Sequence, residues 1–228
     1  MRSILGIDTA GPRGSVAIAV DGKARESEPL APGGHSSGLA GAVERLLAAH
    51  GIGVRDLAGI AVSEGPGSFT GLRIGLAWAK GAAIGGGVPL LLVPAHEALA
   101  HAARALAPRF ATVTQGERGH AMAALWAGGG GAPVEKARLL WGPEVVAEED
   151  LMERLRAEAK GDVPFAAATE SLEELVQDLG GTLLATVLLA PAVAELGDHA
   201  LAEKRIADPR AAAPVYGRAP NARKPAAR

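Results

Sequence analysis

The chain has 228 residues, enough to bury a sizeable core, and we expect two domains. Its 23 basic and 25 acidic residues give a formal net charge of −2, so it lacks the positive field expected of a stand-alone nucleic-acid binder. The absence of cysteine excludes disulfides, thiolate nucleophiles and cysteine-ligated zinc, and it is consistent with the cytoplasm, where we expect the protein.

Short strands and helices alternate along the first half. Turn residues separate three opening strands, and the following apolar segments alternate between helix and strand periodicity. The expected strands are 4–9, 15–21, 24–30, 57–63 and 88–93, and the expected helices are 35–50, 68–84 and 94–106. No apolar stretch is long and uncharged enough to span a bilayer, and the first residues lack a signal-peptide pattern.

The second half repeats this order. We expect strands at 110–115, 120–126 and 134–141, a helix at 143–160, a late helix at 191–206 and a frayed tail at 218–228. Two halves that each open on a three-stranded meander indicate a duplicated α/β architecture. The expected domains are therefore 1–106 and 107–228, the second being smaller or degenerate.

The segment 64–75 joins an expected strand to an expected helix, with Ser68 placed to cap the helix N-terminus. It is not a Walker A loop, because Gly71 is followed by Leu72 and no lysine is in place to reach a phosphate. It is not a dinucleotide-binding fingerprint, because Thr70 stands where the third glycine is needed. The segment predicts a capped helix start.

The helix at 68–84 contains several glycines, and each costs about 1 kcal/mol relative to alanine in a helix interior. Gly71, Gly75 and Ala79 recur every four residues and make one smooth face that another backbone can approach closely. Two interpretations stay open: the face packs inside its own domain, or it forms a subunit interface.

Residues 65–75, with the sequence GPGSFTGLRIG, resemble the signature of the TsaB family, also called YeaZ. Residues 7–9 resemble the opening strand and turn of that family, and residues 35–36 resemble the start of its first helix. Residues 214–218 resemble its Pro-x-Tyr-x-Arg ending. The resemblance is strong over residues 4–104, about half of the chain.

The TsaB family belongs to the superfamily of actin, sugar kinases and chaperone ATPases. The resemblance therefore implies two related actin-like α/β domains, each a mixed sheet led by a three-stranded meander with flanking helices. Asp8, Thr9 and the turn at 11–14 resemble a degenerate phosphate-binding hairpin. No second such hairpin is recognisable after residue 107, where the glycines at 128–131 and 180–181 indicate turns. The resemblance implies a member without an intrinsic cofactor.

Older labels of this family refer to glycoproteases, so hydrolase chemistry has to be considered. The metal-binding sister family, TsaD, carries two histidines four residues apart on one helix face. Here His96 and His101 are five residues apart, about 140° around a helix, and we expect both at the surface rather than on one metal ion. The other histidines are scattered and no Gly-x-Ser-x-Gly elbow occurs, so we expect no catalytic residues and no metal ligands.

The resemblance implies a non-catalytic subunit of the complex that forms threonylcarbamoyladenosine in tRNA. Such a subunit supports a TsaD-like catalytic partner that holds ATP and metal, joins a TsaE-like ATPase, contacts tRNA only indirectly and forms homodimers when alone. The expected interface comprises Phe69, Thr70, Gly71, Leu72, Arg73, Gly75, Leu76, Ala79, His35 and Leu39. The alternative function is a small ATP-dependent enzyme or a glycoprotease-like hydrolase of the same fold.

Overall fold

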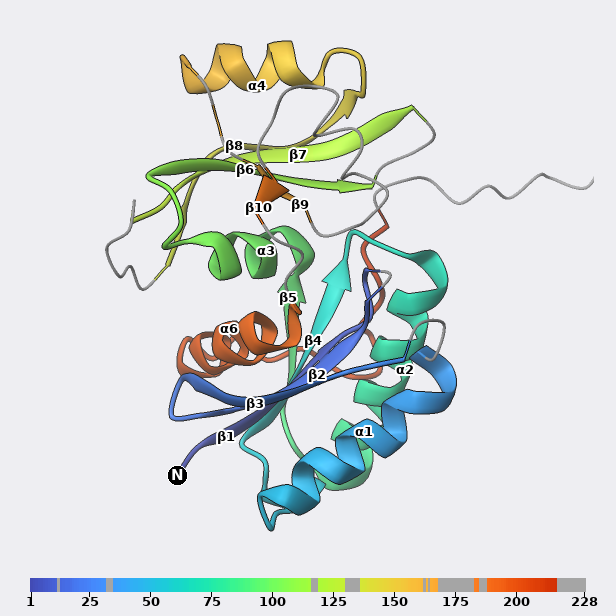
Figure 1. The fold of residues 1–228 in the computed structure, drawn as a ribbon. Coiled ribbons are helices and arrows are strands. Elements are labelled where there is room, and N and C mark those ends of the chain that lie inside the picture. The colour runs from blue at the N-terminus through green and yellow to red at the C-terminus, as the bar shows by residue number, and fades with distance from the viewer. Residues whose placement is uncertain are drawn as a thin grey trace, which may run out of the picture.

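The computed structural model describes residues 1–11, 13–31, 35–115, 119–129, 136–161, 163, 165–167, 183–184 and 188–216. These residues form two mixed sheets, which lie one above the other in Figure 1 with helix α3 between them. None of the described helices is long and apolar enough to cross a membrane.

The first sheet has the strand order β3-β2-β1-β4-β5. Strands β1 to β3 form an antiparallel meander, and β4 and β5 continue the sheet in parallel with β1. Buried β-branched and leucine side chains stabilise the central strands. The bounds are β1 Ser3–Asp8, β2 Ser15–Val20, β3 Lys23–Pro29, β4 Gly59–Gly65 and β5 Leu90–Pro94.

The second sheet has the order β10-β9-β6-β7-β8. Strands β6 to β8 form the antiparallel part, and β9 and β10 pair in parallel with β6 and with each other. The bounds are β6 Arg109–Gln115, β7 His120–Ala127, β8 Arg138–Ala147, β9 Phe165–Ala167 and β10 Leu183–Leu184.

The two sheets have the same topology, with three antiparallel strands followed by two parallel ones. Strand β6 takes the place of β1, β7 and β8 those of β2 and β3, and β9 and β10 those of β4 and β5. The predicted duplication, with a meander opening each sheet, is confirmed.

Helices cover both faces of the first sheet. Helices α1 (His35–Ala49) and α2 (Phe69–Gly86), with the short helix η1 (Val54–Asp56) beside α2, pack on one face over the largest apolar cluster. Helix α6 (Ala190–Ala202) packs on the opposite face. Gly6 of β1 permits this close approach, because a Cβ atom there would collide with the Ala190 carbonyl oxygen.

Helix α3 (Ala95–Ala103) lies between the two sheets and contacts β4, β5, β6 and α6 (Figure 1). Helix α4 (Leu151–Ala159) covers the far face of the second sheet. Residues 190–216 return to the first sheet, where Ala207 bridges to Leu90. The division at residues 106 and 107 stays a prediction, but the chain after residue 107 clearly packs against both sheets.

The predicted helix at 143–160 is wrong in its first part. Residues up to Ala147 continue β8, where Val145 and Val146 pair with β7, and α4 begins only at Leu151. Pro143 is tolerated because β8 is an edge strand with register shifts opposite Ala123 and Leu125. The expected tail at 218–228 lies outside the described residues.

Candidate functional site

The motif at residues 65–75 forms the end of β4, a tight loop and the start of α2. Ser68 is the helix N-cap, as predicted, and its Oγ accepts a hydrogen bond from the Gly71 backbone amide at 3.2 Å. The Ser68 amide in turn donates to the Ala10 carbonyl oxygen at 2.7 Å. The loop is thereby attached to the turn that follows β1.

The inner face of α2 packs against Thr9. Thr9 is fully buried, and its Oγ1 donates a hydrogen bond to the Gly71 carbonyl oxygen at 2.8 Å. A Cβ atom at Gly71 would collide with the Thr9 carbonyl oxygen, and one at Gly75 would collide with Thr9 Oγ1. Both glycines are therefore required by packing inside the domain.

Of the two interpretations of the Gly71, Gly75 and Ala79 face, the contacts with Thr9 bear out packing inside the domain. Ala79 is fully buried in the cluster between α2 and the first sheet. Of the ten residues expected at a partner interface, six others are also buried or have side chains that the structure does not describe. Leu72 is 0 %, Leu39 1 % and Leu76 3 % exposed, Gly71 and Gly75 are also buried, and the His35 side chain lies outside the described part.

The remaining expected interface residues, Phe69, Thr70 and Arg73, are exposed on the first two turns of α2. The Arg73 guanidinium lies 3.8 Å from the Phe69 ring centroid, and its Nε donates to Tyr216 Oη at 2.8 Å. The Phe69 and Tyr216 rings are 4.9 Å apart between centroids. Arg73 thus anchors the C-terminal segment, a contact for which the Pro-x-Tyr-x-Arg resemblance was the only sequence signal.

Backbone contacts hold this C-terminal segment in place. The Val215 amide donates to the Glu64 carbonyl oxygen at 2.7 Å, and Lys80 Nζ donates to the Ala212 carbonyl oxygen at 2.7 Å. The start of α2 and residues 212–216 therefore form one continuous surface.

The outer face of α2 carries a second set of small residues that sequence reasoning did not assign. Ala77, Gly81 and Gly85 recur every four residues and are exposed, and Ile84 beside them is 56 % exposed. A Cβ atom at Gly81 or Gly85 would meet nothing within 4 Å among the described residues. At its C-terminal end this face borders a hollow of about 590 Å³ between α2 and η1, lined in part by Val54.

Asp8 and Thr9, the expected remnants of a phosphate-binding hairpin, are both buried. Asp8 Oδ1 accepts hydrogen bonds from Ser63 Oγ at 2.6 Å and from the Ala10 amide at 3.3 Å. A Cβ atom at Gly67 would meet the Ala10 carbonyl oxygen at 2.5 Å, so the loop before α2 covers this turn. Asp8 and Thr9 therefore make their hydrogen bonds inside the domain, beneath the loop that begins α2, and do not form an open phosphate site.

The expectation that His96 and His101 lie at the surface is wrong. His96 is 1 % and His101 3 % exposed, because α3 lies between the two sheets. His96 Nδ1 and Nε2 lie 2.8 and 3.0 Å from the hydroxyls of Thr112 and Thr114 on β6, and burial lowers the pKa of His96 to about 4. Six of the nine residues 95–103 are alanine or leucine and are spread around the helix, which was the signal that α3 is covered on most sides.

Comparison with known proteins places this geometry in a family. The sequence model described as TsaD: tRNA N6-adenosine threonylcarbamoyltransferase matches residues 29–175, more than half of the chain. The "tRNA threonylcarbamoyladenosine biosynthesis protein TsaB" of Escherichia coli (strain K12) is 39 % identical over 88 residues, which are 39 % of this chain and 38 % of that protein. The protein of the same name from Haemophilus influenzae is 33 % identical over 101 residues, 44 % of this chain and 43 % of that protein.

The alignments therefore span only about two fifths of the length of these curated relatives. The fold extends further, since the solved structure "YeaZ from Pseudomonas aeruginosa" superposes with a TM-score of 0.76 at 25 % identity, covering 95 % of this chain and all of that one. The expected fold class, α/β with two related mixed sheets that each open on a three-stranded meander, is thus confirmed. The chain belongs to the family described by the TsaD model, as a member of the TsaB (YeaZ) type.

Proposed function

We propose that the chain is a non-catalytic subunit of the complex that forms threonylcarbamoyladenosine in tRNA, and that it binds and supports a TsaD-like catalytic subunit. The names of the TsaB relatives and the match to the TsaD model support the pathway. ATP and metal then belong to the catalytic partner, a TsaE-like ATPase joins the complex, and tRNA contacts this subunit only indirectly.

The observation that carries the proposal is the outer face of α2. Glycine in an exposed helix interior costs about 1 kcal/mol relative to alanine, and no contact of the described chain accounts for Gly81. A partner helix that approaches along Ala77, Gly81 and Gly85 offers such an account, because small side chains permit close backbone contact. The exposed Ile84 on the same face adds apolar area to bury.

The interface assigned to the first two helices is thereby moved from the inner to the outer face of α2. Phe69, Thr70 and Arg73 stay in it as exposed residues, joined by Tyr216 through the contact with Arg73. The same surface offers a site for homodimers in the absence of the partner, in which case the two assemblies compete.

Co-expression with a TsaD-like partner and affinity capture test the proposal. Gly81→Leu should reduce capture while the melting temperature of the isolated chain stays unchanged or rises. Gly75→Leu is the matched control, because it adds the same side chain to the buried face of the same helix. Full capture of the Gly81→Leu protein by the partner would refute the outer-face assignment.

Nucleotide titration of the isolated chain tests the alternative of a small ATP-dependent enzyme. An enzyme of this fold has to bind ATP without a partner, whereas the proposal predicts no saturable binding and no turnover. Turnover that Asp8→Ala abolishes would contradict the proposal. Turnover that persists in that variant would point to a contaminating enzyme, and repurification would remove it.

A further inference from the structure

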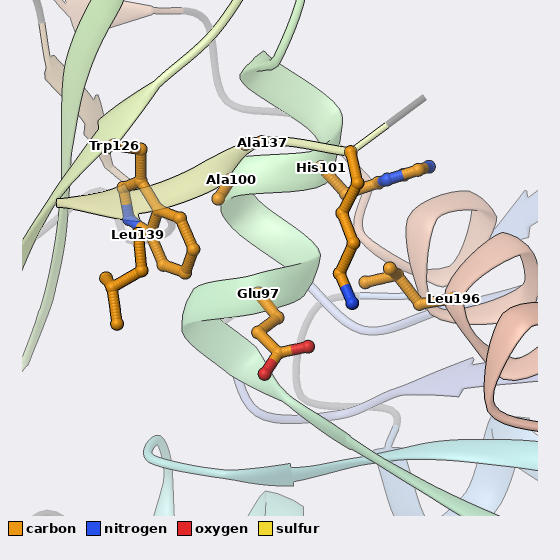
Figure 2. A pocket seen from close by; sticks show the side chains of 8 residues that line it. Glu97, Ala100, His101, Trp126, Ala137, Leu139 and Leu196 are labelled. Carbon is orange, nitrogen blue, oxygen red and sulfur yellow. The ribbon is translucent and has the colours of Figure 1, made fainter. Parts of the chain in front are cut away.

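A small pocket lies where α3, α6 and the second sheet meet, away from the outer face of α2 (Figure 2). Its volume is about 160 Å³. Trp126 and Leu139 line one side of it in Figure 2 and Leu196 of α6 the other, with the α3 helix behind. An engineered cavity of about 150 Å³ holds benzene, so a ligand of roughly six to eight non-hydrogen atoms fits this space.

Two oppositely charged side chains line the pocket, and one of them, Lys136, also lies near Glu203, whose pKa Arg205 and, to a smaller extent, Lys136 lower. Glu97, on the first turn of α3, and Lys136, just before β8, make no hydrogen bond or ion pair within the described part of the chain. They also do not pair with each other, although both border the same small volume. The pocket therefore offers separate positions for a cation and for an anion.

The electrostatic surroundings of Glu97 favour a cation. Burial and the nearby Glu97 carboxylate raise the pKa of Glu64, and Arg205 offsets this only in part. The carboxylates of Glu64, which lies outside the pocket lining, and Glu97 thus repel each other. A positive group between them and the solvent relieves that repulsion.

The third polar group on the wall is the His101 imidazole. Its Nε2 lies 2.7 Å from Glu195 Oε2. Burial opposes ionisation of Glu195, but the hydrogen bonds from His101 and the Ala24 amide outweigh it and lower the pKa of Glu195. Since a carboxylate only accepts hydrogen bonds, the His101 ring proton is on Nε2.

His101 Nδ1 is consequently a bare acceptor, and it is buried without a hydrogen-bond partner among the described residues. Such unpaired buried atoms are rare in folded proteins and call for a specific explanation. Burial lowers the pKa of His101, so the ring is neutral at physiological pH and adds no charge to the pocket wall.

We propose that this pocket binds a small zwitterion of the α-amino acid class. The ammonium group lies toward Glu97, the carboxylate toward Lys136, and the hydrocarbon part against Trp126, Leu139 and Leu196. The pocket size limits the side chain to the small members, from glycine to valine and threonine. This inference does not depend on the proposed role in tRNA modification.

Saturation-transfer NMR and calorimetry on the isolated chain, with glycine, alanine, serine, threonine and valine as probes, test the proposal. We expect a Kd on the order of 1 mM, because two partly exposed charge pairs hold the ligand. Glu97→Gln and Lys136→Gln should each weaken binding at least about fivefold, a change of about 1 kcal/mol by the relation of free energy to Kd. Glu153→Gln and Lys23→Gln, the same changes at exposed sites elsewhere, should leave it unchanged.

Isobutylamine and isovalerate, which are valine without its carboxylate and without its ammonium group, provide matched ligand controls. Both should bind more weakly than valine. The double reversal Glu97→Lys with Lys136→Glu should bind valine better than either single reversal, because a zwitterion can turn around in the pocket. Absence of saturable binding up to about 50 mM, far above the expected Kd, overturns the proposal. So does binding of isobutylamine as tight as that of valine.

Discussion

Helices α2 and α3 follow one another along the chain, yet the fold covers them differently. Helix α2 has a buried inner face that packs on Thr9 and an exposed outer face with Ala77 and Gly81, whereas α3 is buried on nearly all sides between the two sheets. The small residues on the inner face of α2 are therefore required by packing inside the domain, whereas those on the outer face are not. The two histidines of α3 are interior groups with hydrogen-bond partners, as at His96. On both helices, the role of a residue is decided by its neighbours in space, which the topology of the fold sets.

Substitution on the inner face of α2 should have the largest effect. Gly75→Leu places a side chain where Thr9 Oγ1 lies and breaks the hydrogen bond to the Gly71 carbonyl oxygen. We expect a loss of about 3 to 5 kcal/mol in the free energy of unfolding. Urea unfolding measures it, with the exposed Ala77→Leu as control. Equal stability of the two variants would mean that the two faces do not differ as described.

The interior position of α3 predicts a pH dependence of stability. Burial holds the pKa of His96 at about 4, below the ordinary 6.5, so the unfolded chain binds this proton first as the pH falls. The contribution of neutral His96 to the free energy of unfolding is therefore fully present above pH 6.5. It is lost as the pH falls from 6.5 to about 4, and the loss amounts to about 3 kcal/mol.

Urea titrations at several pH values measure this loss. The His96→Gln variant should have a lower stability at neutral pH and a flatter dependence between pH 6.5 and 4, because it lacks the group whose pKa is shifted. A parallel pH dependence in both proteins would place His96 in contact with water and contradict the burial of α3.

A smaller effect on stability is expected at the N-terminus of α2, where Ser68 caps the helix. Ser68→Ala removes the oxygen that accepts from the Gly71 amide and should cost about 1 kcal/mol. Ser68→Asp should retain most of the stability, because aspartate also caps helices well. Thermal unfolding compares the two variants. An alanine variant as stable as the unchanged protein would show that the cap does not contribute.

The outer face of α2 should respond in the opposite direction. The Cβ atom that Gly81→Ala adds meets no other atom within 4 Å among the described residues, and the change removes a glycine from the helix interior. It should therefore stabilise the isolated chain by about 0.5 to 1 kcal/mol. The same substitution at Gly75 should destabilise the chain, because its Cβ atom collides with Thr9. Calorimetry of both variants gives the sign of each change. A loss of stability in both would place the two glycines in equivalent environments.

Local chemistry made part of this molecule predictable from its sequence. The Ser68 cap follows from capping preferences, and the duplicated meander follows from strand periodicity and turn residues. The burial of Gly75 was not predictable, because a repeat of small residues indicates close approach without indicating which segment approaches. The second part of β8, after the predicted strand at 134–141, was missed because Pro143 was read as a helix start, whereas an unpaired strand edge accepts it.

The return of α6 to the first sheet depends on contacts between segments far apart in sequence, such as the close fit of Ala190 on Gly6. The histidines of α3 were misplaced for the same reason, since only the second sheet, packed on the opposite side, completes their burial. Long-range packing therefore set the limit of what the sequence predicted.

The measurement that tests the central claim most directly is capture of a TsaD-like partner by the Gly81→Leu and Ala77→Leu variants, with the melting temperature of each measured in parallel. If the partner binds the outer face of α2, both variants should lose affinity at least tenfold, which is about 1.4 kcal/mol or more. Their melting temperatures should be no lower than that of the unchanged protein. Unchanged affinity in both variants would contradict binding to this face, and the partner surface would then have to lie elsewhere on the molecule.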